Sequence, residues 1–326
     1  MSFSKQVKTE IARHEASARH CQIAEFSAIF QLIGKIKTGR NGKVSLQIHT
    51  ENLTVAQKSY MLLWKTFRVQ VEVAVSHHCA HRESVTYTLL VREQKHILSI
   101  LKAIKMVDEM GGLWGASLKI PSRLVQNTCC KRAYLRGSFL VSGSVTNPEK
   151  SYHLELALPA YDYALQMQRL IKSFGLEAKI VERKKYHVLY MKEGAQIVDF
   201  LNIIEAHIAL MELENVRILK EVRNSVNRQV NCETANIQKT VNAAARQMED
   251  IRYIQCNMGF SRLADGLREV AELRLEYPDS SLVELGNMLN PPLGKSGVNH
   301  RLRKISKIAE QLREEKQGIS PYQKED

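Results

Sequence analysis

The spacing of hydrophobic residues along this chain changes at short intervals and predicts its first elements. Residues 21–33, CQIAEFSAIFQLI, are apolar on almost every side, which is typical of a buried helix. In residues 43–50, KVSLQIHT, apolar and polar side chains alternate, which predicts a strand with one buried face. The turn TGRNG at 38–42 precedes this strand, so we expect a hairpin.

The same order of elements occurs twice. Each pass runs helix, hairpin, helix, hairpin, helix, which predicts two repeat halves at about 1–112 and 113–214. Helices of the first half are expected at 21–33, 52–67 and 94–106, with strands within 69–75 and 84–91. Helices of the second half are expected at 126–142, 160–174 and 194–206.

Beyond the repeats the pattern is helical. No Pro or Gly occurs between Gly194 and Gly259, and residues 215–255 are expected to form a linker of one or two helices. We expect this linker to pack on its neighbours rather than to form a free coiled coil. Residues 256–326 are expected to form a separate all-α domain, with helices at 261–277, at 279–290 and from about 296.

Length and charge narrow the function. A chain of 326 residues can hold two or three domains, and its formal net charge of +13 favours a polyanionic partner such as nucleic acid. Residues 1–222 hold 31 Lys/Arg against 20 Asp/Glu, whereas residues 223–326 hold 16 against 14, so most of the excess lies in the repeats. The polar N-terminus, the lack of a long apolar run and six cysteines without a CxxC pair favour a cytoplasmic protein without a membrane partner.

The last predicted helix combines a buried stripe with a basic face. Five Lys/Arg and no carboxylate occur in residues 295–307, although the helix dipole favours cations at the opposite end. An external anion explains this cluster better than the alternative, a solvated basic face. A DNA-recognition helix enters the major groove with its N-terminal turns. The expected DNA contacts are Ser296, Asn299, His300, Arg301, Arg303, Lys304 and Lys307.

The first helix of each half fits the nine-residue LAGLIDADG pattern of homing endonucleases. Residues 135–143 place Gly137 at its small third position, and residues 26–34 place Ala28 there, so the two helices can approach closely. In the endonucleases the eighth position is a carboxylate from each helix, and the pair holds divalent cations. Here it is Ile33 and Ser142, which are poor ligands for a hard cation. We therefore expect no catalytic residues, no metal at these degenerate positions and no nuclease activity.

Three segments together resemble the WhiA family of bacterial transcription regulators. They are NTCCKRAYLRGSFLVSGSVTNPEKSYHLEL, NRQVNCETANIQKTVNAAARQ and the helices of the C-terminal domain. The resemblance implies a role in sporulation or cell division. It also implies an α+β chain with a pseudo-two-fold, degenerate LAGLIDADG-like domain at 1–214, a linker, and a helix-turn-helix domain at 256–326 that is similar to region 4 of sigma factors.

The sequence thus predicts a transcription regulator that binds double-stranded DNA sequence-specifically in the nucleoid and requires no cofactor. Other regulators or RNA polymerase are further candidate partners. Phosphate contacts are expected around the first hairpin, and a solvated surface is the alternative there. The alternative functions are an adaptor for other regulators and a metal-dependent endonuclease. The phosphate candidates are Lys35, Lys37, Arg40 and Lys43, with Lys131, Arg132 and Arg136 as a second set.

Two cysteine-containing stretches are weaker candidates for chemistry. The segment 76–83, SHHCAHRE, resembles a metal cluster, but it lies between two strands and is better explained as a solvated hairpin tip. Cys129 and Cys130 have no His or acid nearby in the sequence, so we expect them to be small packing residues. No metal site is expected.

Overall fold

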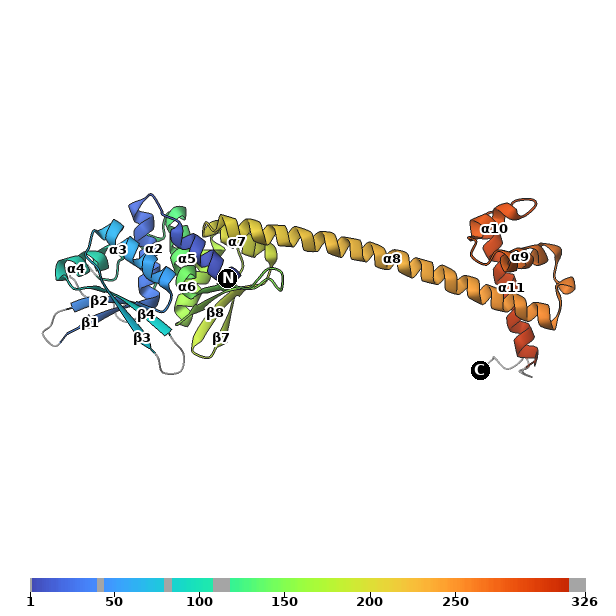
Figure 1. Cartoon of the computed structure of the whole chain (residues 1–326), viewed down its shortest axis with the longest axis horizontal. Helices are drawn as coiled ribbons and strands as arrows, with labels where there is room; N and C mark the ends of the chain where they lie inside the picture. The colour runs from blue at the N-terminus through green and yellow to red at the C-terminus, as the bar shows by residue number, and fades with distance from the viewer. Residues whose placement is uncertain (1, 40–43, 79–83, 108–117, 317–326) are drawn as a thin grey trace. The chain divides into compact units, whose positions relative to one another are not determined.

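The computed structural model describes residues 2–39, 44–78, 84–107 and 118–316. The chain divides into two compact units, unit 1 at Met1–Glu221 and unit 2 at Val222–Asp326. One helix, α8 at His207–Asn257, belongs to both (Figure 1). The expected domain boundaries at residues 214 and 255 stay a prediction.

Unit 1 contains the predicted repeat. The first half has α1 (Phe3–Arg13), α2 (Arg19–Ile33), β1 (Gly34–Thr38), β2 (Val44–Thr50), α3 (Leu53–Phe67), β3 (Glu72–His78), β4 (Ser84–Val91) and α4 (Gln94–Ala103). The second half, after a short 3₁₀ turn, has α5 (Thr128–Ser142), β5 (Gly143–Val145), β6 (Leu154–Leu158), α6 (Tyr161–Lys172), β7 (Lys179–Arg183), β8 (Tyr186–Met191) and α7 (Gly194–Ile203).

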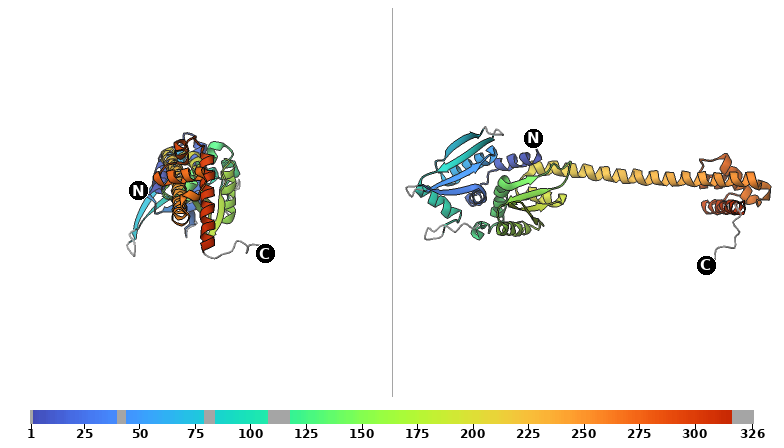
Figure 2. Two further views of the ribbon diagram at one scale, coloured as in Figure 1. Left: turned by 90° about the vertical axis from the view of Figure 1, so that its right-hand side faces the viewer. Right: turned by 90° about the horizontal axis from the view of Figure 1, so that it is seen from below.

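The two halves build equivalent sheets. Their strand orders are β1-β2-β4-β3 and β5-β6-β8-β7, and every pairing is antiparallel. The alternation predicted for β2 is confirmed, because Leu46 and Ile48 are fully buried beneath the helices of the first half. Figure 2 shows the sheets and their helices from two further sides.

Helices α2 and α5 pack against each other where the halves meet (Figure 1). Each has 15 residues, and each ends at a glycine, Gly34 or Gly143, with φ of −78°. Every position of α2 therefore corresponds to the position 109 residues later in α5. One continuous hydrophobic core extends through both halves, and the helix pair lies within it.

Helix α1 was not anticipated by the hydrophobic pattern. Its buried residues Phe3, Val7 and Ile11 recur every four positions and join the core. The helix also holds the start of α8, because the Glu10 carboxylate accepts the Ile208 N–H at 2.7 Å and the Ala209 N–H at 3.0 Å. These are two of the N–H groups that have no partner inside a helix.

The predicted linker is one continuous helix rather than two, but it is not packed along its length. Residues 221–243 of α8 are all exposed, so the expectation that this stretch packs on its neighbours is wrong within this chain. Among the residues described, no helix has the length and apolarity that a membrane crossing requires.

The described residues of unit 2, 222–316, form helices and no strand, as expected. After the end of α8 and a 3₁₀ turn come α9 (Asp265–Glu276), α10 (Leu282–Met288) and α11 (Lys295–Lys316). Ile251 and Ile254 of α8 pack with all three helices in a separate core. A capping box begins α10: the Ser281 hydroxyl accepts the Glu284 N–H at 3.3 Å, and the Ser281 N–H donates to the Glu284 carboxylate at 2.7 Å.

Candidate nucleic-acid interface

Helix α11 has the buried stripe that the sequence predicts. Val298, Leu302, Ile305 and Ala309 are at most 1% exposed and contact the core of unit 2. The helix therefore has one fixed orientation on α9 and α10, and its exposed side chains can face a ligand.

The predicted DNA contacts on α11 divide into two groups. Ser296, His300, Arg303, Lys304 and Lys307 are exposed, and Asn299 is half-buried. Within the described part of the chain, no ion pair engages the side chains of Arg303, Lys304 or Lys307. These three cations form a basic face that has no internal counter-charge, which suits phosphate or base contacts.

Arg301 differs from these cations because it is used inside unit 2. Its guanidinium is half-buried and donates to the Gly266 carbonyl at 3.0 Å, so it ties α11 to α9. Lys295 is not among the expected contacts. It is exposed at the first position of α11 and adds a positive charge to the N-terminal end of this helix.

The connection between α10 and α11 depends on one glycine. A Cβ at Gly286 would lie 2.0 Å from the Leu293 carbonyl oxygen. The Leu293 N–H donates to the Gly286 carbonyl at 2.9 Å, so the two backbones touch directly. This close approach fixes the angle at which α11 leaves the turn, which sequence spacing could not show.

The eighth motif positions of unit 1 lie at the C-terminal ends of α2 and α5 and are not carboxylates. Ile33 and Ser142 are both half-buried there, and the Ser142 hydroxyl donates to the Ser138 carbonyl at 2.9 Å. The small third positions do have the predicted role. A Cβ at Gly137 would lie 2.4 Å from the Glu25 carbonyl oxygen and 3.2 Å from the Ala28 Cβ.

A buried charge cluster lies along these helices, and it corrects one prediction. Arg136 is 1% exposed, and its guanidinium donates to both carboxylate oxygens of Glu25 at 3.3 and 3.2 Å and also to Glu205. It cannot contact phosphate. Lys58 lies 3.1 Å from Glu25 and donates to the His14 carbonyl at 2.5 Å. Burial lowers the pKa of Lys58, and the Glu25 carboxylate opposes that shift.

The other two cations of α5 are also engaged within unit 1. Arg132 donates to the carbonyls of Asn202 at 2.7 Å and Ile203 at 3.0 Å, and so caps the end of α7. Lys131 donates to the Ser173 hydroxyl at 3.2 Å. Arg132 is thus committed to α7, as Arg136 is to its carboxylates, whereas Lys131 bonds only a neutral hydroxyl at the surface and stays a predicted phosphate contact.

The first hairpin retains two phosphate candidates. Lys35 and Lys37 are exposed on β1 and point to the same side of the sheet, opposite Gln47 and Ser45 of β2. Burial and then these two cations, Lys37 before Lys35, lower the pKa of His49 on the neighbouring strand. Arg40 and Lys43 lie outside the described residues, as do Cys79 and His81 of the 76–83 segment.

The prediction that Cys129 and Cys130 are small packing residues is confirmed for Cys130, which is buried with Cys21, Ala24 and Ala133. It is wrong for Cys129, which is exposed, and the expected absence of a nearby histidine is also wrong. Cys129 and Cys130 do have a histidine beside them, because His20 Nδ1 lies 3.1 Å from the Cys130 sulfur and 3.3 Å from the Cys21 sulfur. The ligand atoms of His20, Cys21, Cys129 and Cys130 all lie within 4.8 Å of one another. Burial raises the pKa of Cys21 to about 12 and also raises that of Cys130.

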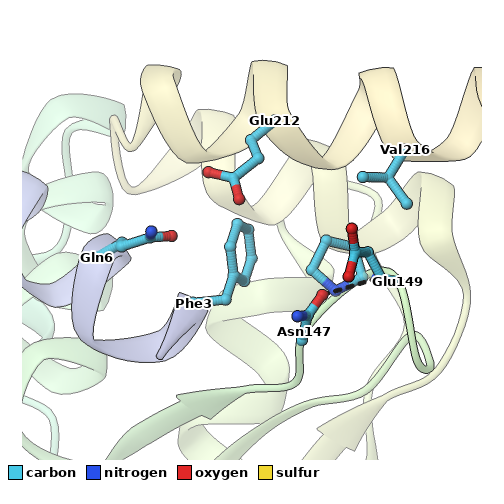
Figure 3. A pocket seen from close by; sticks show the side chains of 7 residues that line it. Phe3, Gln6, Asn147, Glu149, Glu212 and Val216 are labelled. Atoms are coloured by element: carbon cyan, nitrogen blue, oxygen red, sulfur yellow. Dashed lines mark hydrogen bonds between the residues drawn. The ribbon is translucent and has the colours of Figure 1, made fainter. Parts of the chain in front are cut away.

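One cleft of unit 1 is unsuited to DNA. It has a volume of ≈ 220 Å³ and lies where α1 and the 147–149 turn face the start of α8 (Figure 3). Glu149 and Glu212 supply two carboxylates to its lining, which would repel a phosphate. The cleft is also lined by Phe3, Gln6, Asn147, Pro148 and Val216.

A paired-helix fold with two four-stranded sheets, joined to a trihelical domain with a basic helix, defines a LAGLIDADG-like protein with a helix-turn-helix domain. Three family models match in this order: the WhiA N-terminal LAGLIDADG-like domain at 19–107, the WhiA LAGLIDADG-like domain at 131–223 and the WhiA C-terminal HTH domain at 226–309. The chain belongs to the WhiA family.

Relatives match along the whole chain. This chain is 51% identical over 317 residues to the "Probable cell division protein WhiA" of Lachnoclostridium phytofermentans. The alignment covers 96% of this chain and 100% of the relative. The chain is 47% identical over 319 residues to the protein of the same description from Clostridium botulinum, covering 98% and 100%. The crystal structure of full-length DUF199/WhiA from Thermatoga maritima superposes with a TM-score of 0.58 at 27% identity, covering 95% of this chain and 99% of that one.

Proposed function

We propose that this protein is a sequence-specific DNA-binding transcription regulator that acts in cell division, in chromosome-related processes or in sporulation. The observation that supports it best is the basic face of α11, where Arg303, Lys304 and Lys307 stand out from a well-packed helix. The match to the WhiA C-terminal HTH domain and the description of the relatives as probable cell division proteins support the same function.

In this proposal the parts of the chain have separate tasks. The domain at 256–326 recognises the DNA sequence through α11. The helix at 215–255 links this domain to the repeats, and the repeats at 1–214 form a scaffold. Lys35 and Lys37 add phosphate contacts on the scaffold. Double-stranded DNA in the nucleoid is the partner, and other regulators or RNA polymerase are the protein partners on which regulation would depend.

The first experiment is DNA capture followed by footprinting. Genomic fragments are enriched with the full chain at a stated salt concentration, and the best fragment is used as the probe. Replacing Arg303 and Lys304 together with Ala should weaken specific binding about 100-fold and make the affinity less dependent on salt, because two cations at the interface are lost.

The control removes the same charge elsewhere in unit 2. Arg252→Ala with Arg262→Ala removes two exposed cations that lie outside α11, and it should change the affinity by less than about threefold. Equal loss in the two double variants would show that α11 contributes only general charge. An unchanged footprint in the Arg303/Lys304 variant would refute its role as the reader and favour the adaptor function.

We further propose that the protein does not cut DNA, because Ile33 and Ser142 occupy the positions where an endonuclease requires acids. Supercoiled plasmid that carries the captured fragment should remain intact with the full chain and Mg²⁺ or Mn²⁺. Cleavage that copurifies with the protein and persists in an Arg136→Met variant, whose buried charge cluster is broken, would identify a contaminant. Cleavage lost with the Ser142→Ala change alone would overturn the proposal.

A further inference from the structure

We propose that His20, Cys21, Cys129 and Cys130 form a binding site for a thiophilic transition-metal ion, with Zn²⁺ as the expected occupant. The site lies at the N-terminal ends of α2 and α5, at the opposite end of the helix pair from Ile33 and Ser142. It differs from an endonuclease metal site in its ligands as well as its position.

The geometry of the four groups is close to that of a tetrahedral site. With Zn–S of about 2.3 Å and Zn–N of about 2.0 Å, neighbouring ligand atoms lie roughly 3.5–3.8 Å apart. The His20 Nδ1 lies 3.1 and 3.3 Å from two of the sulfurs, and no pair among the four ligand atoms exceeds 4.8 Å. The observed separations therefore bracket those that a tetrahedral ion requires.

The repeat explains how two adjacent pairs come to face each other without a CxxC motif. His20 and Cys21 are the second and third residues of α2, and Cys129 and Cys130 are the second and third residues of α5. The pairs are related by the same offset of 109 residues that relates Gly34 to Gly143. Each half thus contributes two ligands across the pseudo-two-fold axis.

The charge and packing around the cluster also suit a metal with thiolate ligands. A helix N-terminus favours negative charge, yet neither α2 nor α5 has an acidic residue in its first turn. Three thiolates around a divalent cation would supply that negative charge. Cys21 and Cys130 are buried with Ala24 and Ala133 in a small cluster separate from the main core, so water has little access to two of the sulfurs.

Three cysteines and one histidine match the ligand sets of structural zinc sites, in which the protein fills all four positions. The ion would cross-link the two motif helices at the end that lacks the Gly137 contact. Such a site contributes to folding stability rather than to hydrolysis, because it leaves no position for a reacting water.

The test uses the full chain, stripped of metal under reducing conditions and titrated with Co²⁺. Tetrahedral thiolate coordination gives intense visible d–d bands and a near-ultraviolet sulfur-to-cobalt band. We expect both to saturate at one equivalent and to disappear when Zn²⁺ is added. Protein purified without chelator should contain one zinc per chain.

The ligand variants start with the two exposed groups, because their replacement should leave the fold intact. His20→Ala and Cys129→Ser should each weaken the cobalt bands and lower the zinc content, while far-ultraviolet circular dichroism stays unchanged. Cys21→Ser and Cys130→Ser should abolish binding. The matched control is Cys232→Ser with Cys256→Ser, which changes two exposed cysteines of α8 and should retain full binding.

Three results would overturn the proposal. One is cobalt bands that persist in Cys129→Ser and are lost in the Cys232/Cys256 control. The second is absence of both bands and zinc in a chain with the native circular dichroism. The third is a disulfide among the three clustered cysteines in protein purified under reducing conditions, seen as a loss of two hydrogens by mass spectrometry.

Discussion

Replacing Glu25 with Gln should lower the free energy of unfolding of unit 1 by about 3–5 kcal/mol. Glu25 is fully buried, and its carboxylate is the shared counter-charge of Lys58 and Arg136, which are 2% and 1% exposed. Without it, two cations face each other away from water. Arg136 would retain only Glu205, and Lys58 only the His14 carbonyl.

Urea unfolding of the full chain, followed by tryptophan fluorescence, measures this loss. The chain has two tryptophans, Trp64 and Trp114, and both precede residue 222 in the sequence, where unit 2 begins. The control is Glu72→Gln, which breaks an exposed ion pair with Arg92 and should cost less than about 1 kcal/mol.

A triple variant separates charge from packing. Glu25→Leu, Lys58→Met and Arg136→Met together should recover most of the stability lost in Glu25→Gln, because a buried ion cluster can often be replaced by apolar groups of similar volume. If Glu25→Gln loses no more than Glu72→Gln, the cluster is not what stabilises the helix pair.

Replacing Gly137 with Ala should cost about 3 kcal/mol, which is large for the addition of one methyl group. The new Cβ would lie 2.4 Å from the Glu25 carbonyl oxygen, which belongs to a helix backbone and cannot rotate away as a side chain could. Helices α2 and α5 would have to move apart, and that movement would also lengthen the hydrogen bonds between Arg136 and Glu25.

The control for Gly137→Ala is Gly194→Ala at the start of α7. A Cβ there would meet its nearest atoms at 3.5–3.6 Å, which is ordinary contact, so the urea midpoint should hardly change. Equal midpoints for the wild type and Gly137→Ala would show that the helix pair tolerates a wider spacing than the structure has.

Much of the fold could be predicted because it depends on local patterns. The alternation in residues 43–50 predicts β2, and the all-round apolarity of residues 21–33 predicts α2, since each pattern reflects which side chains face the core. The apolar stripe of α11 likewise fixes which side of that helix is buried. These signals lie within a few residues of one another.

Contacts between distant residues could not be predicted in the same way. From the sequence alone, Arg136 would be assigned to the surface. Its burial is explained only by its ion pair with Glu25, which is 111 positions away in the sequence. The cluster of His20 with Cys130 spans 110 positions and has no metal-site spacing within either segment. A signal was nevertheless present, because the offset that aligns the two LAGLIDADG motifs also aligns His20 with Cys129 and Cys21 with Cys130.

The contact of Glu10 with the first turn of α8 has a consequence for the order of events during synthesis. Glu10 and Ile208 are 198 positions apart. A ribosome that adds roughly 5–20 residues per second leaves about 10–40 seconds between them. During that interval the Glu10 carboxylate has no partner in α8, because the N–H groups that donate to it have not yet been made. The hydrogen bonds between α1 and α8 are thus among the last contacts of unit 1 to form, although α1 already packs on α3 and α5, and nascent chains that end before residue 208 lack them.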